Sequence, residues 1–197
     1  MSGLATAARH SCDSPEWYTP ARYVEAAREV MGGIDLDPAS HLEANRTVKA
    51  ARFLTEADNG LTREWHGRVF LNPPGGLVGE FWGHLLREYA SGRTVQAIWI
   101  GYSLEQLQTL QCVPGAALAP LVFPFCVPKR RIAFVENEAK RAARLEKVRA
   151  ENVERAARGE KLRSEKNGPS HGNWITYLGP LVDRFVEVFS AFGQVRV

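Results

Sequence analysis

Two short apolar runs that end in proline turns constrain the fold of this chain more than any other feature of its sequence. The first run, IDLD at residues 34–37, meets a proline at residue 38. The second run, RVFL at residues 68–71, is followed directly by NPP at residues 72–74. Each run is too short for a helix, and proline seldom continues a helix or an inner strand. Both runs are therefore predicted to be buried strands that lead into loops.

Segments with helical spacing of apolar residues alternate with these and other short apolar runs. Residues 21–30 place their apolar side chains on one helical face after Pro20, and two glycines at residues 32–33 end the pattern. Further helices are predicted at residues 41–51, 81–89 and 181–192, and further strands at residues 95–100, 118–125, 132–135, 174–178 and 194–197. The alternation predicts an α/β fold with a doubly wound parallel sheet and an antiparallel edge. Ligands of such sheets bind beyond the carboxyl ends of the strands, where both proline turns fall.

The composition indicates one soluble domain. The chain has 197 residues, of which 45% are hydrophobic and 24% charged, ordinary proportions for a domain with a filled core. No run is apolar enough to span a membrane, and the first residues lack a signal-peptide pattern, so a cytoplasmic protein is predicted. Residues 1–16 are predicted to form a flexible arm ahead of a domain at residues 17–197. The 3 widely spaced cysteines predict reduced thiols and no metal site.

The NPP turn is the strongest candidate for a catalytic element. It fixes the amide of Asn72 and the backbone carbonyls of Pro73 and Pro74 at the mouth of a sheet, and it offers acceptors in a stiff arrangement. An exocyclic amino group that donates to the Asn72 side-chain oxygen and the Pro73 carbonyl has its lone pair drawn out of conjugation, so that it can attack an electrophile. The alternative interpretation is a strand-terminating turn in which Asn72 caps backbone groups.

The turn after the first run carries two carboxylates, Asp35 and Asp37, at the end of a strand. Carboxylates in this place accept hydrogen bonds from a cofactor amine or a ribose hydroxyl in dinucleotide sites. The alternative is a helix N-cap, with Asp37 or Ser40 serving backbone amides.

Several motifs in one order resemble the phage-type DNA N6-adenine methyltransferases, the Dam-like family of phages and prophages. In sequence order they are WYTP at 17–20, IDLDPAS at 34–40, FLTEADNGL at 53–61 followed by Trp65, VFLNPPGG at 69–76, AIWIGYSLEQLQ at 97–108, FPFCVPKRRIAF at 123–134 and PSHGNWITYLG at 169–179. The resemblance covers residues 17–179 except for a charged insert. A set of motifs in one order is far more specific than any one of them.

The resemblance implies a class I S-adenosylmethionine-dependent methyltransferase with a Rossmann-like sheet of seven strands. It also implies that the enzyme acts on adenine N6 of double-stranded DNA. The implied location is the cytoplasm, which is the cytoplasm of the host cell if the chain is phage-encoded. By position, the resemblance implies that Tyr18, Thr19 and Pro20 line the methionine end of the cofactor, and that Asp35, Asp37, Pro38 and Ala39 form the first cofactor motif. It implies that Asp58 approaches the cofactor adenosine. Asn72, Pro73 and Pro74 match the catalytic motif, in which Asn72 also touches the cofactor.

Two positions depart from the family's pattern. The first cofactor motif usually carries a glycine-rich loop, and here it reads DPASH. The catalytic motif usually ends in an aromatic residue that stacks on the flipped target base, and here Gly75 follows the prolines. Stacking contributes about 1–3 kcal/mol per base, so another ring is needed or the enzyme is weaker. The candidate rings are Trp65, Phe81, Trp82 and Tyr102, each of which has core packing as its alternative role.

A charged insert at residues 136–167 carries the basic excess of the chain, with ten Lys/Arg against seven Asp/Glu between Glu136 and Lys166. Its composition and its Glu-to-basic pairs four residues apart predict a helix that projects or folds back at Gly159. With Lys129, Arg130 and Arg131, it is a candidate for contact with DNA phosphates. The alternative is a solvated helix or disordered loop that binds nothing.

Other acceptors and an inactive site remain open from the sequence alone. NPP motifs also serve methyl transfer to cytosine N4, to RNA and to protein amides. A catalytically idle DNA-binding or cofactor-binding protein is the alternative of a different class, whereas a nuclease lacks a clustered carboxylate and lysine set. His171 is predicted to be structural rather than catalytic. The sequence predicts neither the DNA recognition sequence nor the oligomeric state.

Overall fold

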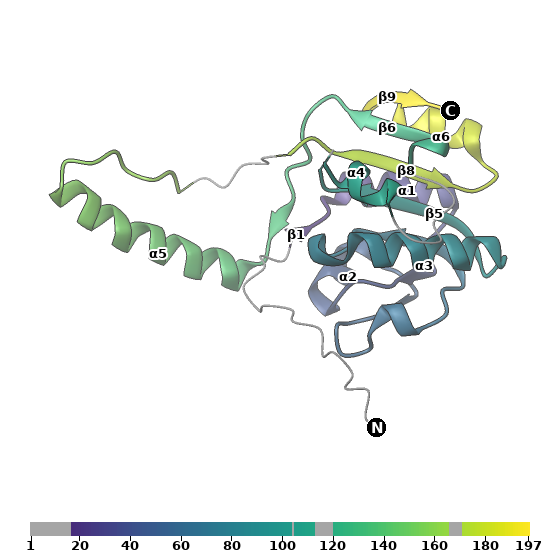
Figure 1. Ribbon diagram of the computed structural model, residues 1–197, viewed down its shortest axis with the longest axis horizontal. Coiled ribbons are helices and arrows are strands. Elements are labelled where there is room, and N and C mark those ends of the chain that lie inside the picture. Colours follow the sequence, from purple (N-terminus) through teal and green to yellow (C-terminus); the bar gives the residue numbers. More distant parts are fainter. Residues whose placement is uncertain (1–16, 104, 113–119, 166–170) are drawn as a thin grey trace. The chain divides into compact units, whose positions relative to one another are not determined.

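A computed structural model describes residues 17–103, 105–112, 120–165 and 171–197 (Figure 1). The arm predicted at residues 1–16 lies outside the described residues. Contacts divide the chain into two compact units. The smaller comprises Met1–Tyr18 and Val135–Asn167, and the larger comprises Thr19–Phe134 and Gly168–Val197.

The larger unit is built on a mixed sheet of seven strands in the order β3-β2-β4-β5-β8-β6-β9. The strands are β2 (Leu36–Asp37), β3 (Arg52–Phe53), β4 (Gly67–Leu71), β5 (Thr94–Gly101), β6 (Phe125–Pro128), β8 (Trp174–Leu178) and β9 (Gly193–Arg196). The four strands from β3 to β5 are parallel, and β8, β6 and β9 pair antiparallel. The α/β class and the antiparallel edge predicted from the sequence are confirmed.

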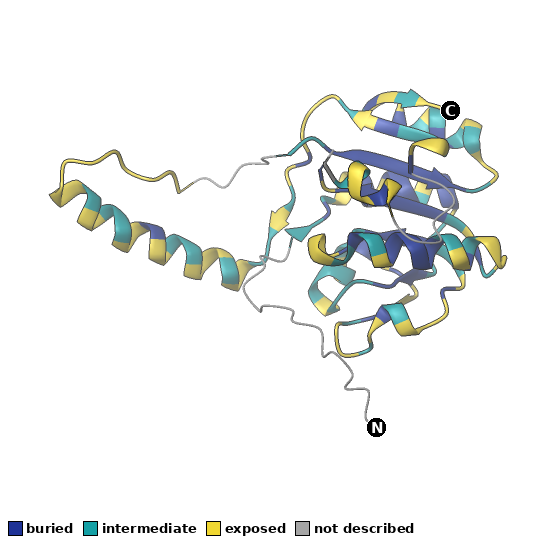
Figure 2. Cartoon of the chain, in the orientation of Figure 1, coloured by how far each residue is buried: buried dark blue, intermediate teal, exposed yellow. Residues whose placement is uncertain are grey.

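Helices cover both faces of this sheet. One face packs against α3 (Val78–Ala90) and α4 (Glu105–Gln111), and the other against α1 (Ala21–Met31) and α6 (Val182–Phe189). The alternation of side chains along β5 assigns Trp99 to the α3 face and Ile98 and Ile100 to the α1 face. The strands β5 and β8, which are neighbours in the sheet, are largely buried (Figure 2). The remaining short elements are α2 (Leu42–Val48) and the 3-10 turns Gly60–Thr62, Gly75–Leu77 and Pro120–Val122.

The first helix begins and ends at the signals that predicted it. Pro20 is its N-cap, and the Pro20 carbonyl accepts the backbone N–H of Tyr23 at 3.0 Å. Gly32 adopts a left-handed conformation, with φ of 77°, and its N–H closes the helix on the Arg28 carbonyl at 2.7 Å. Glycine adopts this conformation without steric cost, so the chain turns here into β2.

The late strands differ from their predicted positions. Part of the strand predicted at 118–125 lies outside the described residues, Pro120–Val122 is a 3-10 turn, and β6 begins only at Phe125. Prolines at 120 and 124 remove ladder donors, whereas Pro128 is tolerated as the last residue of β6. The strand predicted at 132–135 is also wrong, because only Val135–Glu136 is extended, as β7.

The smaller unit contains a strand pair and a long helix. β1 (Trp17–Tyr18) pairs antiparallel with β7. The helix α5 (Glu138–Ala157) ends before Gly159, whose φ is 68°, and the chain then folds back along the helix, as one of the two predicted forms requires. The side chain of Asn152 holds the returning backbone through two hydrogen bonds. The backbone N–H of Arg163 donates to Asn152 Oδ1 at 2.7 Å, and Asn152 Nδ2 donates to the Arg163 carbonyl at 3.0 Å.

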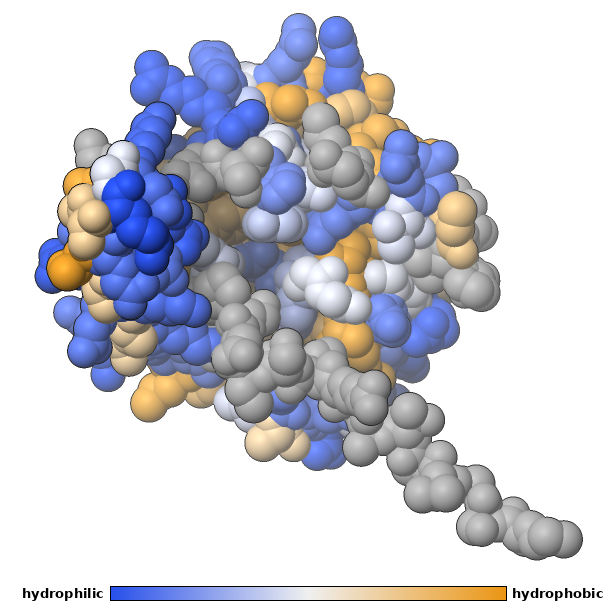
Figure 3. Space-filling model, turned by 60° about the vertical axis from the view of Figure 1, so that its left-hand side comes forward, coloured by the Kyte–Doolittle hydropathy of each residue, from blue (hydrophilic) through white to orange (hydrophobic). Residues whose placement is uncertain are grey.

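The charges of this folded-back segment are largely matched within it. Five arginines pair with glutamates of the same unit: Arg144 with Glu136, Arg149 with Glu165, Arg155 with Glu160, Arg158 with Glu154 and Glu160, and Arg163 with Glu151. Many of the side chains of this segment are hydrophilic in the space-filling view of Figure 3. Part of the basic character of the insert therefore serves its own fold.

A buried carboxylate ties α3 to the strands beside it. Glu88 is only 4% exposed and accepts hydrogen bonds from Arg93 Nε at 2.6 Å, Arg93 Nη2 at 2.9 Å and the backbone N–H of Trp65 at 3.0 Å. The Arg93 hydrogen bonds hold the pKa of Glu88 at about 2, well below its usual value of 4.5.

Glu88→Gln is expected to lower the free energy of unfolding at pH 7 by about 2–3 kcal/mol, because charge-assisted hydrogen bonds are lost. The contribution of the wild-type carboxylate is present above pH 4.5 and is lost as the pH falls toward 2. Urea unfolding at pH 7 and at pH 3 measures both effects. Glu64→Gln is the matched control, since the exposed Glu64 is 4.0 Å from the same arginine and is expected to change little.

Candidate functional site

The topology gathers the predicted motifs at one edge of the sheet. The parallel strands β2, β3, β4 and β5 all end at this edge, β6 runs in the same direction, and β8 begins there. The amino end of α1 also lies on this side, because its carboxyl end leads into the start of β2. The segments that meet at the edge are residues 19–20, 37–40, 54–60, 72–76, 102–103, 129–131 and 171–173. This carboxyl edge is the candidate site.

Asp37 is a buried carboxyl group at the end of β2. It is 4% exposed, and its Oδ1 accepts the backbone N–H of Ala39 at 3.3 Å. Burial raises the pKa of Asp37 from 3.8 to about 7. No cationic side chain of the described part of the chain forms an ion pair with it. A cationic ligand at this position would favour the ionised carboxylate.

Asp35, two residues earlier, has a different environment. Its Oδ2 accepts Arg68 Nε and the Arg68 backbone N–H, both at 2.8 Å, and its Oδ1 accepts Arg68 Nη2 at 2.6 Å. These bonds hold the pKa of Asp35 below its usual value. The structure therefore separates the two carboxylates: Asp37 lies at the carboxyl edge, and Asp35 is bound to the neighbouring strand β4.

The loop that contains Asp58 packs directly on the loop that contains Pro38. A side chain at Gly60 would overlap the Pro38 carbonyl, and the Trp65 indole N–H donates to the Gly60 carbonyl at 2.9 Å. Asp58 closes its own loop by accepting the Thr55 N–H at 2.8 Å and the Thr55 hydroxyl at 2.7 Å, which lowers the pKa of Asp58. The loops that contain Pro38 and Gly60 are thus in contact, and one carboxylate oxygen of Asp58 is bound within its own turn.

The NPP turn leaves β4 at the middle of the same edge. Asn72 is half-buried, Pro73 is buried and Pro74 is exposed. The glycines that follow, Gly75 and Gly76, have no atom within 4 Å of where a Cβ would lie, and neither has a positive φ. A side chain at Gly75 would therefore enter open space.

One hydroxyl group near the edge, Thr19 Oγ1 just before α1, is buried without a hydrogen-bond partner among the described residues. The side chain of Ser40, just after the Asp37 turn, instead interacts with the Asp37 carboxyl group and partly offsets the effect of burial on the pKa of Asp37. Buried polar atoms in folded proteins nearly always have a partner, so each such atom needs an explanation. Polar ligand groups at this edge would supply one.

Four predicted residues lie in other surroundings. Tyr18 belongs to β1 of the smaller unit, where its hydroxyl accepts Asn137 Nδ2 at 2.7 Å. Of the four candidate rings, Trp65, Phe81 and Trp82 are buried in the core beside α3, while Tyr102 is 37% exposed. Burial thus leaves Tyr102 as the accessible ring of the four.

The basic triplet follows β6 at the same edge. Lys129, Arg130 and Arg131 are all exposed, and the Lys129 backbone N–H is anchored on the Phe192 carbonyl at 2.9 Å. The buried amide of Asn173 holds this loop, a role that its motif alone does not predict. Its Oδ1 accepts the N–H of Ile132 at 2.8 Å, and its Nδ2 donates to the Tyr102 carbonyl at 2.8 Å. The sequence signal for this role is the position of Asn173, a polar residue directly before the apolar run at residues 174–178.

Comparison with known proteins defines the class of this chain. Ligands of α/β sheets bind beyond the carboxyl ends of the strands, where the NPP turn and the buried Asp37 lie. A family model, DNA N-6-adenine-methyltransferase (Dam), matches residues 7–151. The chain belongs to this family, which implies DNA adenine N6-methyltransferase activity with DNA as substrate.

Searches of curated proteins and of solved structures each found no significant match. Within the described part of the chain, no helix is long and apolar enough to cross a membrane. In the same residues, no three His, Cys, Asp or Glu side chains form a group suited to a metal ion.

Asp37→Asn is expected to stabilise the protein at pH 8 by on the order of 2 kcal/mol. The wild-type folded state holds a proton on Asp37 that the unfolded state releases, so wild-type stability falls as the pH rises from 3.8 to about 7. Thermal unfolding across pH 4–8 tests this, with the exposed Asp183→Asn as control. Parallel profiles for wild type and Asp37→Asn would contradict the buried, neutral state.

Proposed function

We propose that this protein is an S-adenosylmethionine-dependent methyltransferase of class I type that methylates adenine N6 on a base rotated out of double-stranded DNA. The observation that carries the proposal is the position of the NPP turn, at the carboxyl end of β4 and between the ends of β2 and β5, in a member of the Dam family. Site-specific methylation is the form of this activity that we infer.

The residues at the edge fit the proposed cofactor. S-adenosylmethionine supplies an electrophilic methyl group on a sulfonium and also carries an ammonium group and hydroxyls. The buried carboxyl group of Asp37 lacks a cation, and the hydroxyl of Thr19 lacks a partner within the described residues. These groups are suited to the ammonium and to polar atoms of the cofactor. Pro20, Pro38, Ala39 and Asp58 complete the proposed cofactor set.

Two of the predicted cofactor residues stand apart from this set. Asp35 is left out of the proposed binding groups because Arg68 already occupies both of its carboxylate oxygens. The role of Tyr18 remains a prediction from its motif alone.

The NPP turn would prepare the amino group for attack. The exocyclic amino group of adenine donates its two hydrogens to the Asn72 side-chain oxygen and to the Pro73 carbonyl, and Pro74 keeps the loop stiff. The two acceptors would direct the nitrogen lone pair toward the methyl group that bound S-adenosylmethionine would supply from its sulfonium, whose sulfur would keep the electron pair of the broken S–C bond. The extra proton on nitrogen is lost to water after attack, so positioning and electrostatics supply most of the rate. Extrusion of the base makes N6 accessible.

Asn72→Ala is expected to lower methyl transfer at least a hundredfold, comparable to the loss of one oriented hydrogen-bonding group in other active sites. The assay incubates protein with methyl-deuterated S-adenosylmethionine and adenine-unmethylated DNA, and mass spectrometry of the nucleosides detects labelled N6-methyldeoxyadenosine. Calorimetric titration with the cofactor should show that the variant still binds it. A variant with near wild-type transfer would refute the role of the turn, and label on cytosine N4 would change the target base.

The basic triplet is proposed to hold DNA phosphates near the site. Lys129, Arg130 and Arg131 are exposed and lie at the same edge as the NPP turn. Cations bind phosphates without regard to sequence and position the duplex. The insert is a weaker candidate, because five of its arginines pair with its own glutamates.

Replacement of Lys129, Arg130 and Arg131 by alanine is expected to weaken DNA binding and to reduce the slope of log affinity against log salt by up to about 3, at about 0.9 per phosphate contact. Fluorescence anisotropy with one labelled duplex between 50 and about 200 mM salt measures the slope. The control is Arg46→Ala with Lys49→Ala, two exposed basic residues before β3 at the opposite edge. Equal slopes for wild type and the triple variant would remove the triplet from the interface.

A further inference from the structure

We propose that Tyr102 is the ring on which the target base stacks, with His171 as its backing, and this inference rests on the proposed function. A base extruded from a duplex is commonly held between aromatic or apolar side chains, which replace the stacking that the base has lost. The NPP turn offers no such side chain, because Gly75 and Gly76 follow it with open space around them. A ring must therefore come from another element of the edge.

The topology places Tyr102 next to the turn. β4 and β5 are neighbours, and Leu71 of β4 pairs with Trp99 of β5. Asn72 therefore follows beside the last residues of β5, and Tyr102 is the first residue after β5 ends at Gly101. The two residues begin adjacent loops at the same edge of the sheet.

Burial singles out this ring from the other aromatic side chains. Among the described phenylalanine, tyrosine and tryptophan residues of the larger unit, only Tyr102 is exposed, at 37%. The others are buried or half-buried, and the half-buried ones are Phe53, Tyr89, Phe123, Phe125, Phe134 and Phe192. Only the Tyr102 ring is thus presented at the edge with a substantial accessible surface.

The backbone of Tyr102 is fixed on both sides. Its N–H donates to Gln106 Oε1 at 3.0 Å, and its carbonyl accepts Asn173 Nδ2 at 2.8 Å. Asn173 is itself 5% exposed and also binds the Gly101 carbonyl at 3.2 Å. An exposed ring on a fixed backbone loses little conformational freedom when a ligand stacks on it, which is the arrangement expected of a binding surface.

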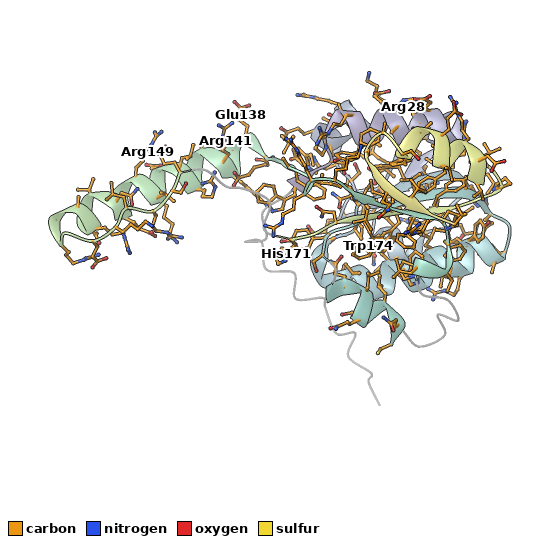
Figure 4. The ribbon with its side chains drawn as sticks, turned by 90° about the horizontal axis from the view of Figure 1, so that it is seen from above. Arg28, Glu138, Arg141, Arg149, His171 and Trp174 are labelled. Atoms are coloured by element: carbon orange, nitrogen blue, oxygen red, sulfur yellow. The ribbon has the colours of Figure 1, made fainter. Side chains whose placement is uncertain are left out.

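His171 supports the ring from the residues before β8. The His171 and Tyr102 ring centroids are 5.0 Å apart, with an angle of 51° between their planes. Figure 4 shows His171 at the end of the chain segment that leads into β8, with Trp174 further inside the sheet. The pair therefore joins the ends of β5 and β8 into one aromatic surface at the edge.

The first test compares variants of Tyr102 in the methyl-transfer assay described above, with unmethylated genomic DNA so that the recognition sequence need not be known. Tyr102→Phe, which keeps the ring, is expected to stay within about twofold of wild type. Tyr102→Leu, which keeps apolar bulk but lacks a ring, is expected to lose about 5- to 150-fold in kcat/KM, the factor that stacking of one base represents. Val95→Ala, 51% exposed at the other end of β5, is the control.

A rescue at Gly75 separates stacking from a structural role. In the Tyr102→Leu background, Gly75→Tyr places a ring in the open space beside the NPP turn. The double variant is expected to transfer methyl groups at least fivefold faster than Tyr102→Leu alone. Gly75→Leu in the same background is the matched control and is expected to restore nothing. A structural defect at Tyr102 would not be repaired by a ring on another loop.

The outcomes distinguish failure of the stacking role from failure of the proposed function. If the wild-type protein transfers methyl groups and the Tyr102→Leu variant stays within twofold of its kcat/KM, the stacking role is overturned and the proposed function stands. An equal loss in Tyr102→Phe and Tyr102→Leu, or equal rescue by the tyrosine and the leucine at Gly75, would also overturn it, because the ring would not be the active feature. Absence of methyl transfer by the wild-type protein that binds the cofactor would overturn both proposals. Cofactor binding by calorimetry establishes that each variant is folded.

Discussion

The pairing of β5 with β8 is the interaction on which the arrangement of the carboxyl edge depends. Five residue pairs join the two strands antiparallel, and the ring of Trp174 lies against Gly101, where any side chain would overlap it. This pairing ends the parallel part of the sheet and begins its antiparallel part. It also brings Asn173 to the end of β5, where one buried amide holds the Gly101 and Tyr102 carbonyls together with the Ile132 N–H.

The parts of the fold that local sequence determines were predicted well. β2, β4, β5 and β8 are short apolar runs with proline or glycine near their ends, and α1 has a proline before it and a glycine after it. Several elements that the sequence does not predict depend on distant partners. β1 and β7 are two residues each and exist only because they pair with one another across more than a hundred residues, and β6 takes its place between β8 and β9. No pattern within such a short segment indicates its partner.

The candidate site shows the same division. The NPP turn was predicted at the mouth of the sheet because proline fixes the backbone wherever the turn occurs. The roles of Asp35 and Asp37 were not distinguishable in the sequence, since both carboxylates belong to one motif. Arg68 separates them: it lies 33 residues from Asp35 and reaches it through the pairing of β2 with β4. Burial likewise decided among four candidate rings, because exposure depends on the packing of α3 rather than on residue type.

Among the described residues, the two buried carboxyl groups, Glu88 and Asp37, differ in whether a cation pairs with them. Glu88 has Arg93, Asp35 has Arg68, and the arginines of α5 have glutamates of their own unit. At the edge, Asp37 is buried with a pKa of about 7, and Thr19 has a buried hydroxyl without a partner within the described residues. Such groups cost stability in the free protein. Because Glu88 already has its cation and Asp37 has none among the described residues, a cationic ligand bound at the carboxyl edge would offset the cost of burying Asp37.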